Sequence, residues 1–169
     1  MKIVERLLFT LVLLTIAVAS AAGDSRTVVG LVEEVKITPG GLTLESKLDT
    51  GADHSSLHAV NISRFRRGSE RWVRFDVVNA EGDRVTLERE LARVSRIKSP
   101  DDRPQKRPTV MLGVCLGNVY KEIEVNLVDR SRFRNKMLIG RSFMKDKLLV
   151  DPSKKNTVKP TCSEAEKQK

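Results

Sequence analysis

The sequence predicts an all-β protein with one short helix near its C-terminal end. Three observations support this class: apolar residues recur at every second position, the apolar runs end at glycine-containing turns, and helical periodicity is scarce. Strands joined in this way typically form a sheet that closes on itself or packs against a second sheet.

The first two strands are expected in the N-terminal third of the sequence. Residues 28–37 are rich in β-branched side chains and end at the turn 38–41, where Pro39 precedes two glycines. Residues 42–48 then alternate between leucines or serine on one side and polar residues on the other, as a half-buried strand does.

Later strands follow the same pattern, with Gly82 in one hairpin turn and Gly117 in a second. A short helical turn is expected over residues 142–145. These strands are expected at residues 72–78, 85–91, 110–116, 119–128, 136–140 and 148–150.

Composition divides the chain into three parts. Residues 1–22 carry Lys2 and Arg6, then an apolar run, then small residues, which is typical of a secretory signal peptide. An uncleaved N-terminal anchor is the alternative. The sequence thus predicts an exported protein, periplasmic or secreted, without stable membrane insertion after cleavage. Residues 23–152 are expected to form one domain, and residues 153–169 a disordered polar tail.

Charge and cysteine content exclude some functions. The net charge is +9, but the basic residues are scattered and only 4% of residues are aromatic, so a solvated surface is expected rather than a nucleic-acid partner. An oxidising compartment would permit a disulfide. However, Cys115 lies in an apolar run and Cys162 in the polar tail, so the two are expected to be unpaired.

One segment carries the chemistry. An apolar strand leads directly into Asp49-Thr50-Gly51, which places a carboxylate on a tight turn. Taken alone, the tripeptide favours an ordinary Asp-initiated turn over a catalytic site. If a second carboxyl faces Asp49, the two share a proton; one activates a water and the other donates to a substrate carbonyl.

Two motifs together give a resemblance to a known family. Residues 48–53, followed downstream by residues 137–144 with Gly140-Arg141, resemble the active-site segments of retropepsins, the single-lobe aspartic peptidases. The chain is still more similar to bacterial proteins named ATP-dependent zinc proteases, now regarded as retropepsin-like. The stretches that match them are 29–33, 47–53, 71–75, 107–108, 124–130 and 137–151.

The resemblance implies a closed acid-protease β-barrel and peptidase activity. It implies Asp49, Thr50 and Gly51 as catalytic residues, with the site supported by Ala52, Asp53, Gly140 and Arg141. It further implies that Asp53 and Arg141 form a buried salt bridge. Relatives are associated with ligases that add glutamate tails, which implies acidic or γ-glutamyl peptides as substrates.

The sequence holds one Asp-Thr-Gly, whereas the reaction needs two facing carboxyls. A symmetric homodimer is therefore predicted, with Asp49 and its mate on the two-fold axis.

The family name suggests cofactors that the residues do not support. A glycine-rich phosphate-binding loop is absent, so no nucleotide is expected. His54 and His58 are weak candidates for a metal site: their spacing fits a helix, but the segment lacks the Glu of HExxH and is expected to be a strand. No cofactor is predicted.

Two questions stay open at this stage. Residues 71–91 are the positional counterpart of the retropepsin flap, and residues 95–108, predicted to be an exposed loop, are the alternative cover. A non-catalytic barrel that binds a peptide or cell-envelope partner, and a zinc-dependent hydrolase, are the competing functions.

Overall fold

The computed structural model describes residues 26–97 and 104–163 and confirms an all-β protein with a single short helix in that part of the chain. The predicted signal peptide lies outside the described residues. Across the described ranges, no helix combines the length and apolar character needed to cross a bilayer. The elements are β1 (Thr27–Thr38), β2 (Thr43–Leu48), β3 (Ser55–His58), β4 (Val60–Arg67), β5 (Glu70–Val78), β6 (Arg84–Glu90), β7 (Arg93–Ile97), β8 (Gln105–Leu116), β9 (Val119–Val128), β10 (Met137–Ile139), α2 (Arg141–Met144) and β11 (Leu148–Lys155).

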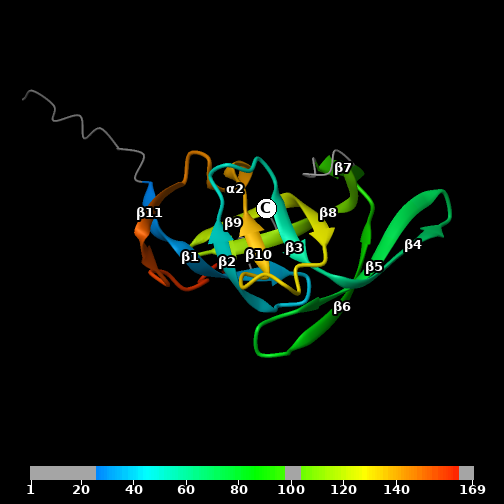
Figure 1. The fold of residues 1–169 in the computed structure, drawn as a ribbon, viewed down its shortest axis with the longest axis horizontal. Helices are drawn as coiled ribbons and strands as arrows, with labels where there is room; N and C mark the ends of the chain where they lie inside the picture. Colours follow the sequence, from blue (N-terminus) through cyan, green and yellow to red (C-terminus); the bar gives the residue numbers. More distant parts are fainter. Residues whose placement is uncertain (1–25, 98–103, 164–169) are drawn as a thin grey trace, which may run out of the picture.

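The main sheet closes into a barrel (Figure 1). Its strands follow the order β11-β1-β2-β10-β3-β9-β8-β7, and β1 also pairs with β8. This extra pairing completes a ring of six strands, β1-β2-β10-β3-β9-β8, while β11 and β7 extend the sheet beyond the ring. The expected closed barrel is therefore confirmed.

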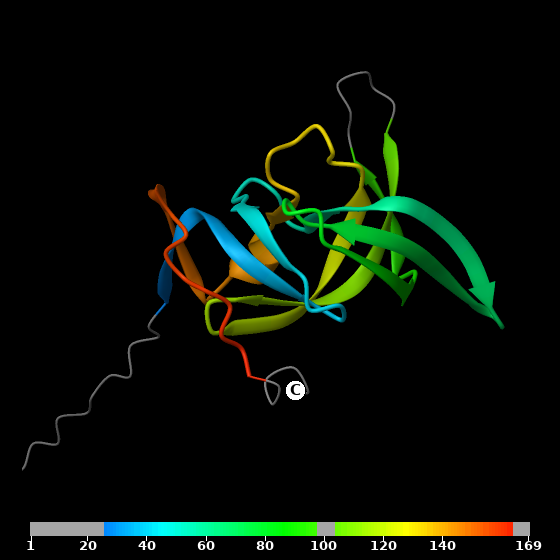
Figure 2. The ribbon, with the colours of Figure 1, turned by 90° about the horizontal axis from the view of Figure 1, so that it is seen from below.

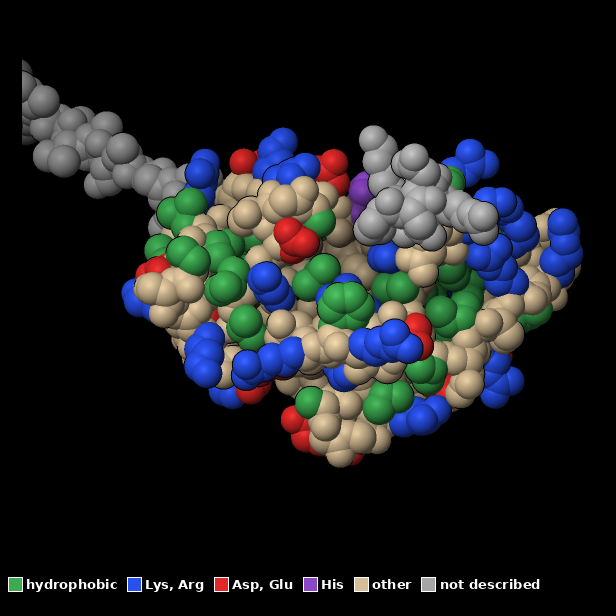
Figure 3. Space-filling model, in the orientation of Figure 1, with side chains coloured by type: hydrophobic (Ala, Val, Ile, Leu, Met, Phe, Trp, Pro, Cys, Tyr) green, Lys and Arg blue, Asp and Glu red, His purple; other side chains and the backbone are tan. Residues whose placement is uncertain are grey.

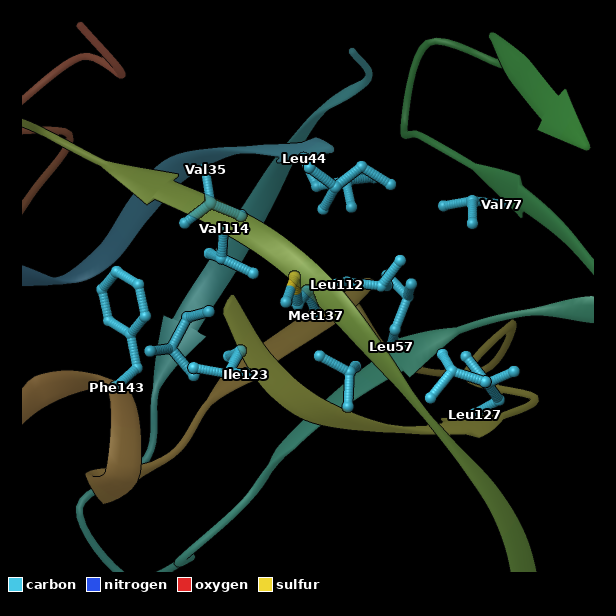
Figure 4. Close-up of a cluster of buried hydrophobic side chains, with 14 of the residues drawn as sticks. Val35, Leu44, Leu57, Val77, Leu112, Val114, Ile123, Leu127, Met137 and Phe143 are labelled. Atoms are coloured by element: carbon cyan, nitrogen blue, oxygen red, sulfur yellow. The ribbon is translucent and has the colours of Figure 1, made fainter. Parts of the chain in front are cut away.

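Alternation along the strands fills the barrel with apolar side chains. Val35 from β1, Leu44 from β2, Leu57 from β3, Leu112 from β8 and Met137 from β10 are all buried and converge inside it (Figure 4). Because side chains on a strand point alternately to opposite faces, the period-two pattern in the sequence becomes one shared interior.

A second, three-stranded sheet projects from one side of the barrel (Figure 2). It is ordered β4-β5-β6, and we call it the arm (residues 60–90). Val73, Phe75 and Val77 of β5 are buried and join the barrel core, whereas most of β4 is exposed. The predicted β5–β6 hairpin is confirmed, and residues 55–58 form β3, the strand expected after the Asp49 turn. β4 was not predicted, because residues 60–67 lack clear apolar alternation.

Within residues 95–108, predicted to be an exposed loop, residues 95–97 and 105–108 instead form strands. β7 pairs antiparallel with the first part of β8, from Arg93 opposite Thr109 to Ile97 opposite Gln105. Charged residues and Pro108 obscured this hairpin in the sequence; Pro108 lies opposite Val94, in β8 beside the edge strand β7. Residues 98–103 lie outside the described part.

The C-terminal segment is also more ordered than the sequence predicted. β11 continues to Lys155 in parallel pairing with β1, and the partly buried Val158 packs against the core. The expectation of unpaired cysteines is wrong, because Cys115 and Cys162 form a disulfide. The apolar run around Cys115 and the polar tail meet at the β8–β9 turn, where Thr161 N–H donates to the carbonyl of Gly117 at 2.7 Å.

A buried carboxylate holds the start of this segment. Glu33 on β1 accepts hydrogen bonds from the backbone N–H groups of Gly30 (2.6 Å), Thr157 (3.0 Å) and Val158 (3.2 Å) and from the Thr157 hydroxyl (2.5 Å). Burial alone would raise the pKa of Glu33, but these hydrogen bonds outweigh it and lower the pKa below its ordinary value.

Acid is therefore expected to weaken the fold through Glu33. Because its folded-state pKa is lowered, its contribution is complete above the unfolded value of 4.5 and is lost as the pH falls through the folded value. Glu33→Gln should cost about 1–3 kcal/mol of unfolding free energy at neutral pH and flatten the acid dependence. Urea unfolding against pH measures both, with the exposed neighbouring pair member Glu34→Gln as control. If the unfolding free energy of Glu33→Gln fell with decreasing pH as steeply as that of the wild type, this account would be wrong.

Candidate active site

Asp49 stands immediately after β2, where the backbone turns. Its N–H donates to the carbonyl of Ile139 on β10 at 2.8 Å, so the parallel β2–β10 pairing fixes where the turn begins. Its Oδ1 accepts from the N–H of Gly51 at 3.0 Å, and a Cβ on Gly51 would lie only 3.3 Å from that oxygen. The Asp49 side chain is half-buried, while Thr50 and Gly51 are exposed.

The turn is fastened to the residues around Gly140. Arg141 N–H donates to Ala52 O at 2.9 Å, and Ser142 N–H donates to Asp53 O at 3.0 Å. Gly140 N–H donates to the buried Ser55 hydroxyl at 3.1 Å. A Cβ on Gly140 would lie 2.6 Å from the His54 carbonyl carbon, so only glycine permits this approach of two backbone segments.

The Arg141 side chain adds a second clamp on the same turn. One guanidinium nitrogen pairs with Asp53 Oδ1, and Nη1 donates to the carbonyl of Thr50 at 2.9 Å. The pair implied by the family resemblance is therefore present. It is not buried in the single chain: the Arg141 and Asp53 side chains are 50% and 70% exposed.

A buried arginine, Arg130, interacts electrostatically with the half-buried Arg107 and with Asp49. Burial lowers the pKa of Arg130, repulsion from Arg107 lowers it further, and attraction to Asp49 opposes both. Burial also lowers the pKa of Arg107. Both guanidinium groups remain charged at any physiological pH.

These arginines are held by neutral partners. Arg107 Nη1 donates to Asn126 Oδ1 at 3.1 Å, and its Nε and Nη2 donate to Gln105 Oε1. Arg130 Nε donates to the carbonyl of Asn135 at 3.2 Å, with its guanidinium 4.6 Å from the Phe133 ring centroid. Within residues 26–97 and 104–163, no carboxylate forms an ion pair with either arginine. Sequence reasoning missed them because each came from a scattered basic stretch.

The two histidines have separate partners. His54 lies before β3, with Nδ1 3.8 Å from Glu124. His58 ends β3, is buried, and its Nδ1 accepts from the N–H of Arg130 at 2.8 Å. Among the described residues, no cluster of three or more metal-ligating side chains is found. His54 and His58, the weak metal candidates, thus contact different groups, the Glu124 carboxylate and the Arg130 backbone N–H.

Most of the positional counterpart of the flap, residues 71–91, forms β5 and β6 of the arm. The alternative segment supplies Arg107 from β8, whose charge acts on Arg130. Which of the two segments covers the site stays a prediction.

An open groove of about 810 Å³ flanks the turn. Thr50, Asp53 and Arg141 line one part of it, and Met144 and Leu149 line another. Leu149 on β11 is 48% exposed and pairs with Val28 on β1, which is 52% exposed. An exposed apolar strip thus borders the polar clamp.

The comparisons with known proteins agree with this geometry. Residues 28–161 match the RimB-like family model, described as the retropepsin-like aspartic endopeptidase RimB. A solved structure of a Legionella pneumophila protein of unknown function shares 37% identity with a TM-score of 0.69, covering 80% of this chain and all of that one.

Curated relatives carry a different kind of name. A probable alpha-L-glutamate ligase of Shewanella pealeana is 35% identical over 134 residues, covering 77% of this chain and 29% of the relative. One of Desulfotalea psychrophila is 34% identical over 113 residues, or 65% of this chain and 24% of the relative. The chain thus spans less than a third of the length of these relatives. From the match over residues 28–161, together with the fold and the clamped Asp-Thr-Gly turn, the chain belongs to the RimB-like family of retropepsin-like aspartic endopeptidases.

Proposed function

We propose that the protein is an aspartic endopeptidase that acts as a homodimer, with Asp49 of each copy supplying one of two facing carboxyls. The observation that carries this proposal is the Asp49 turn itself. It ends a strand, is half-buried, and is fastened by backbone hydrogen bonds to Gly140-Arg141. Such positional control is what a catalytic carboxyl requires.

The chemistry follows from two carboxyls sharing one proton. The ionised member removes a proton from a water molecule, whose oxygen attacks the peptide carbonyl carbon. The protonated member donates its proton to the carbonyl oxygen, and a tetrahedral intermediate forms. Return of a proton to the amide nitrogen then breaks the C–N bond and releases an acid and an amine. The pH dependence belongs to the pair rather than to either Asp49.

The surface around the turn supports pairing of two copies. Thr50, Asp53 and Arg141 are exposed on the single chain, although they are clamped together. Leu149, which pairs with the exposed Val28, lines the same groove as these three residues and adds apolar surface to a face that a second copy could cover. A second copy meeting the first across a two-fold axis would bury both features and bring the two Asp49 turns together.

Replacing Arg141 tests this arrangement. Because the Arg141–Asp53 pair is exposed in one chain, Arg141→Ala should change the unfolding free energy of a subunit by only about 0–1 kcal/mol. It should weaken dimerisation strongly, because the clamp would be buried there and its loss leaves Asp53 uncompensated. Sedimentation and urea unfolding separate the effects, with the exposed Arg134→Ala as control. Arg141→Lys should also fail to restore the dimer, because Lys lacks the fork.

The substrate that we propose is an acidic peptide, such as a glutamyl-rich chain. The charges of Arg107 and Asp49 both act on the pKa of Arg130, and among the described residues neither arginine forms an ion pair with a carboxylate. Two like charges held close together are costly unless an anion joins them. A substrate carboxylate would remove that cost, and the glutamate ligases among the relatives have names consistent with glutamate chains.

Specificity should depend on these two arginines. Arg107→Gln or Arg130→Gln should reduce kcat/KM for a glutamate peptide roughly 10- to 100-fold, the value of a charge-assisted hydrogen bond. A peptide with glutamine in place of glutamate should be affected far less. Arg132→Gln, an exposed arginine two residues from Arg130, is the control. Equal losses on both peptides would assign the arginines to the fold instead.

The direct test of activity is peptide cleavage by purified protein across acidic to neutral pH. We expect hydrolysis of glutamate peptides that disappears in Asp49→Asn and persists in Asp83→Asn, a distant aspartate in the β5–β6 turn. Cleavage that survives Asp49→Asn would refute the proposed chemistry. If no peptide is cleaved but glutamate peptides bind equally well to the wild type and to Asp49→Asn, the barrel is a binding module.

We further propose that the protein is exported after removal of residues 1–22. The sequence order of charged, apolar and small residues supports this. The Cys115–Cys162 disulfide adds support, because such bonds persist mainly in oxidising compartments. Amino-terminal sequencing of the protein from its native host checks the cleavage position.

A further inference from the structure

The two faces of the arm carry different charge arrangements. Residues directly opposite each other in neighbouring strands share a face of the sheet. Pairing places Arg64 opposite Val73, and Val73 opposite Arg89, on the face that packs against the core near the barrel. Further out on the same face, Arg66 lies opposite Arg71. We call Arg64, Arg66 and Arg71 the arginine face.

The opposite face of the arm is neutralised by its own acids. Arg67 forms an ion pair with Glu88 at 2.7 Å, and Arg84 pairs with Asp76 at 2.9 Å. Arg67 also stacks over Trp72, with its guanidinium 4.2 Å from the ring centroid. Positive charge on this face is therefore matched within the arm.

The arginine face has no such balance. Arg64, Arg66 and Arg71 are exposed, and among the described residues none of them forms an ion pair. Arg66 directly faces Arg71 across the β4–β5 pair, an arrangement in which like charges repel. Figure 3 shows Lys and Arg side chains gathered at this end of the molecule, at the right of the view.

We propose that the arginine face is a second binding site for the acidic peptide substrate, outside the cleft at Asp49. The inference rests on the proposed function for the choice of substrate. A long acidic chain whose scissile bond lies near Asp49 would extend beyond the cleft, and the arginine face would hold its outlying carboxylates. The arm is fixed to the strand that carries Arg107, because Arg89 Nε donates to the carbonyl of Met111 on β8 at 3.2 Å.

An extended peptide fits this face better than other polyanions do. β4 is an edge strand of the arm, so its outer side is open to a further strand. Arg64 and Arg66 are two residues apart on β4, about 6.6 Å along the strand, which equals the spacing of alternate side chains in an extended peptide. Trp72 and Phe65 lie on the opposite face and Phe75, on the same face, is fully buried, so among the described residues the arginine face offers no exposed aromatic ring for stacking bases or entering a lipid layer.

Protection of the edge strand does not account for the pattern. Charged side chains on an edge do hinder pairing with other copies, but charges of either sign serve that purpose. One face of the arm carries side chains of both positive and negative charge. The outer end of the other face carries charged side chains that are all arginines. This asymmetry is expected of a site that selects an anion.

The binding test uses the full chain carrying Asp49→Asn, so that the probe is not cut. We expect labelled poly-L-glutamate to bind, and Arg64→Gln/Arg66→Gln/Arg71→Gln to weaken it roughly tenfold, with a smaller salt dependence. The matched control is Arg67→Gln/Arg74→Gln/Arg84→Gln, which removes equal charge from the opposite face. Equal weakening by both triple variants overturns the proposal. So does tighter, arginine-face-dependent binding of single-stranded DNA or phosphatidylglycerol vesicles.

A kinetic test with the active protein separates this inference from the proposed activity. The arginine-face variant should raise KM for long glutamate chains while leaving kcat and the cleavage of short glutamate peptides unchanged. Unchanged KM for long chains overturns the second site but leaves the peptidase intact. If the wild type cleaves nothing, the binding measurement still decides the arginine face, because it needs no catalysis.

Discussion

Mixing wild-type subunits with Asp49→Asn subunits should reduce peptidase activity to about one quarter of that of wild type at the same total concentration. Random pairing of equal amounts gives about one quarter wild-type homodimers, and a mixed dimer keeps only one of the two carboxyls. Asp49→Asn alone should lose at least about 10³-fold in kcat, since asparagine neither takes nor shares the proton. Initial rates on a glutamate peptide after subunit exchange measure both effects.

The control is an equal mixture of wild-type and Asp83→Asn subunits, which should keep full activity. Retention of about one half of the activity in the Asp49→Asn mixture would mean that each subunit works alone, and the homodimer would be wrong. A fall in specific activity, measured per subunit, on dilution below the dimer dissociation constant provides an independent check on the same assembly.

Adding one methyl group at Gly140 should disable the site. In Gly140→Ala the new Cβ would lie 2.6 Å from the His54 carbonyl carbon and 2.7 Å from the Asp53 carbonyl oxygen, so the two backbone segments must separate. We expect a loss of about 1–3 kcal/mol of unfolding free energy. Peptidase activity should fall by more than the loss of folded protein explains, because the hydrogen bonds from Arg141 and Ser142 to the Asp49 turn lengthen.

Ser142→Ala is the matched control for this change. Ser142 is exposed and adjacent, and its substitution adds no atom between the segments. Urea unfolding and peptide cleavage on both variants give the comparison. A Gly140→Ala protein with wild-type stability and activity would show that the turn tolerates displacement, and its fastening would have no catalytic role.

Much of the barrel and of the catalytic turn could be predicted from the sequence. Period-two alternation around Leu44 and Leu48 placed β2, glycine at 82 and 117 placed two hairpin turns, and the family resemblance paired Asp53 with Arg141. The strand and turn signals are local in the sequence. The motif signal includes Gly140, a position where two backbone segments approach so closely that only glycine fits.

The remaining features depend on contacts between distant parts of the chain. β4 was missed because it is an edge strand with little apolar alternation, and β7 because its residues are charged on a barrel rim. Arg107 lies in β8 and Arg130 follows β9, so the sequence does not show that their charges interact in the folded chain. The disulfide was missed for the same reason, since its cysteines are 47 residues apart.

That covalent link has a consequence for how the protein should be made. Closing a loop of 47 residues restricts the unfolded chain and is worth on the order of 4 kcal/mol by chain-entropy reasoning, a large share of the stability of a small domain. Material produced in a reducing cytosol would begin without that restriction, leaving only non-covalent contacts, such as those of Glu33 and the Thr161–Gly117 backbone hydrogen bond, to retain the last residues. Recombinant protein folded under oxidising conditions should therefore withstand heat and proteases that the reduced form does not.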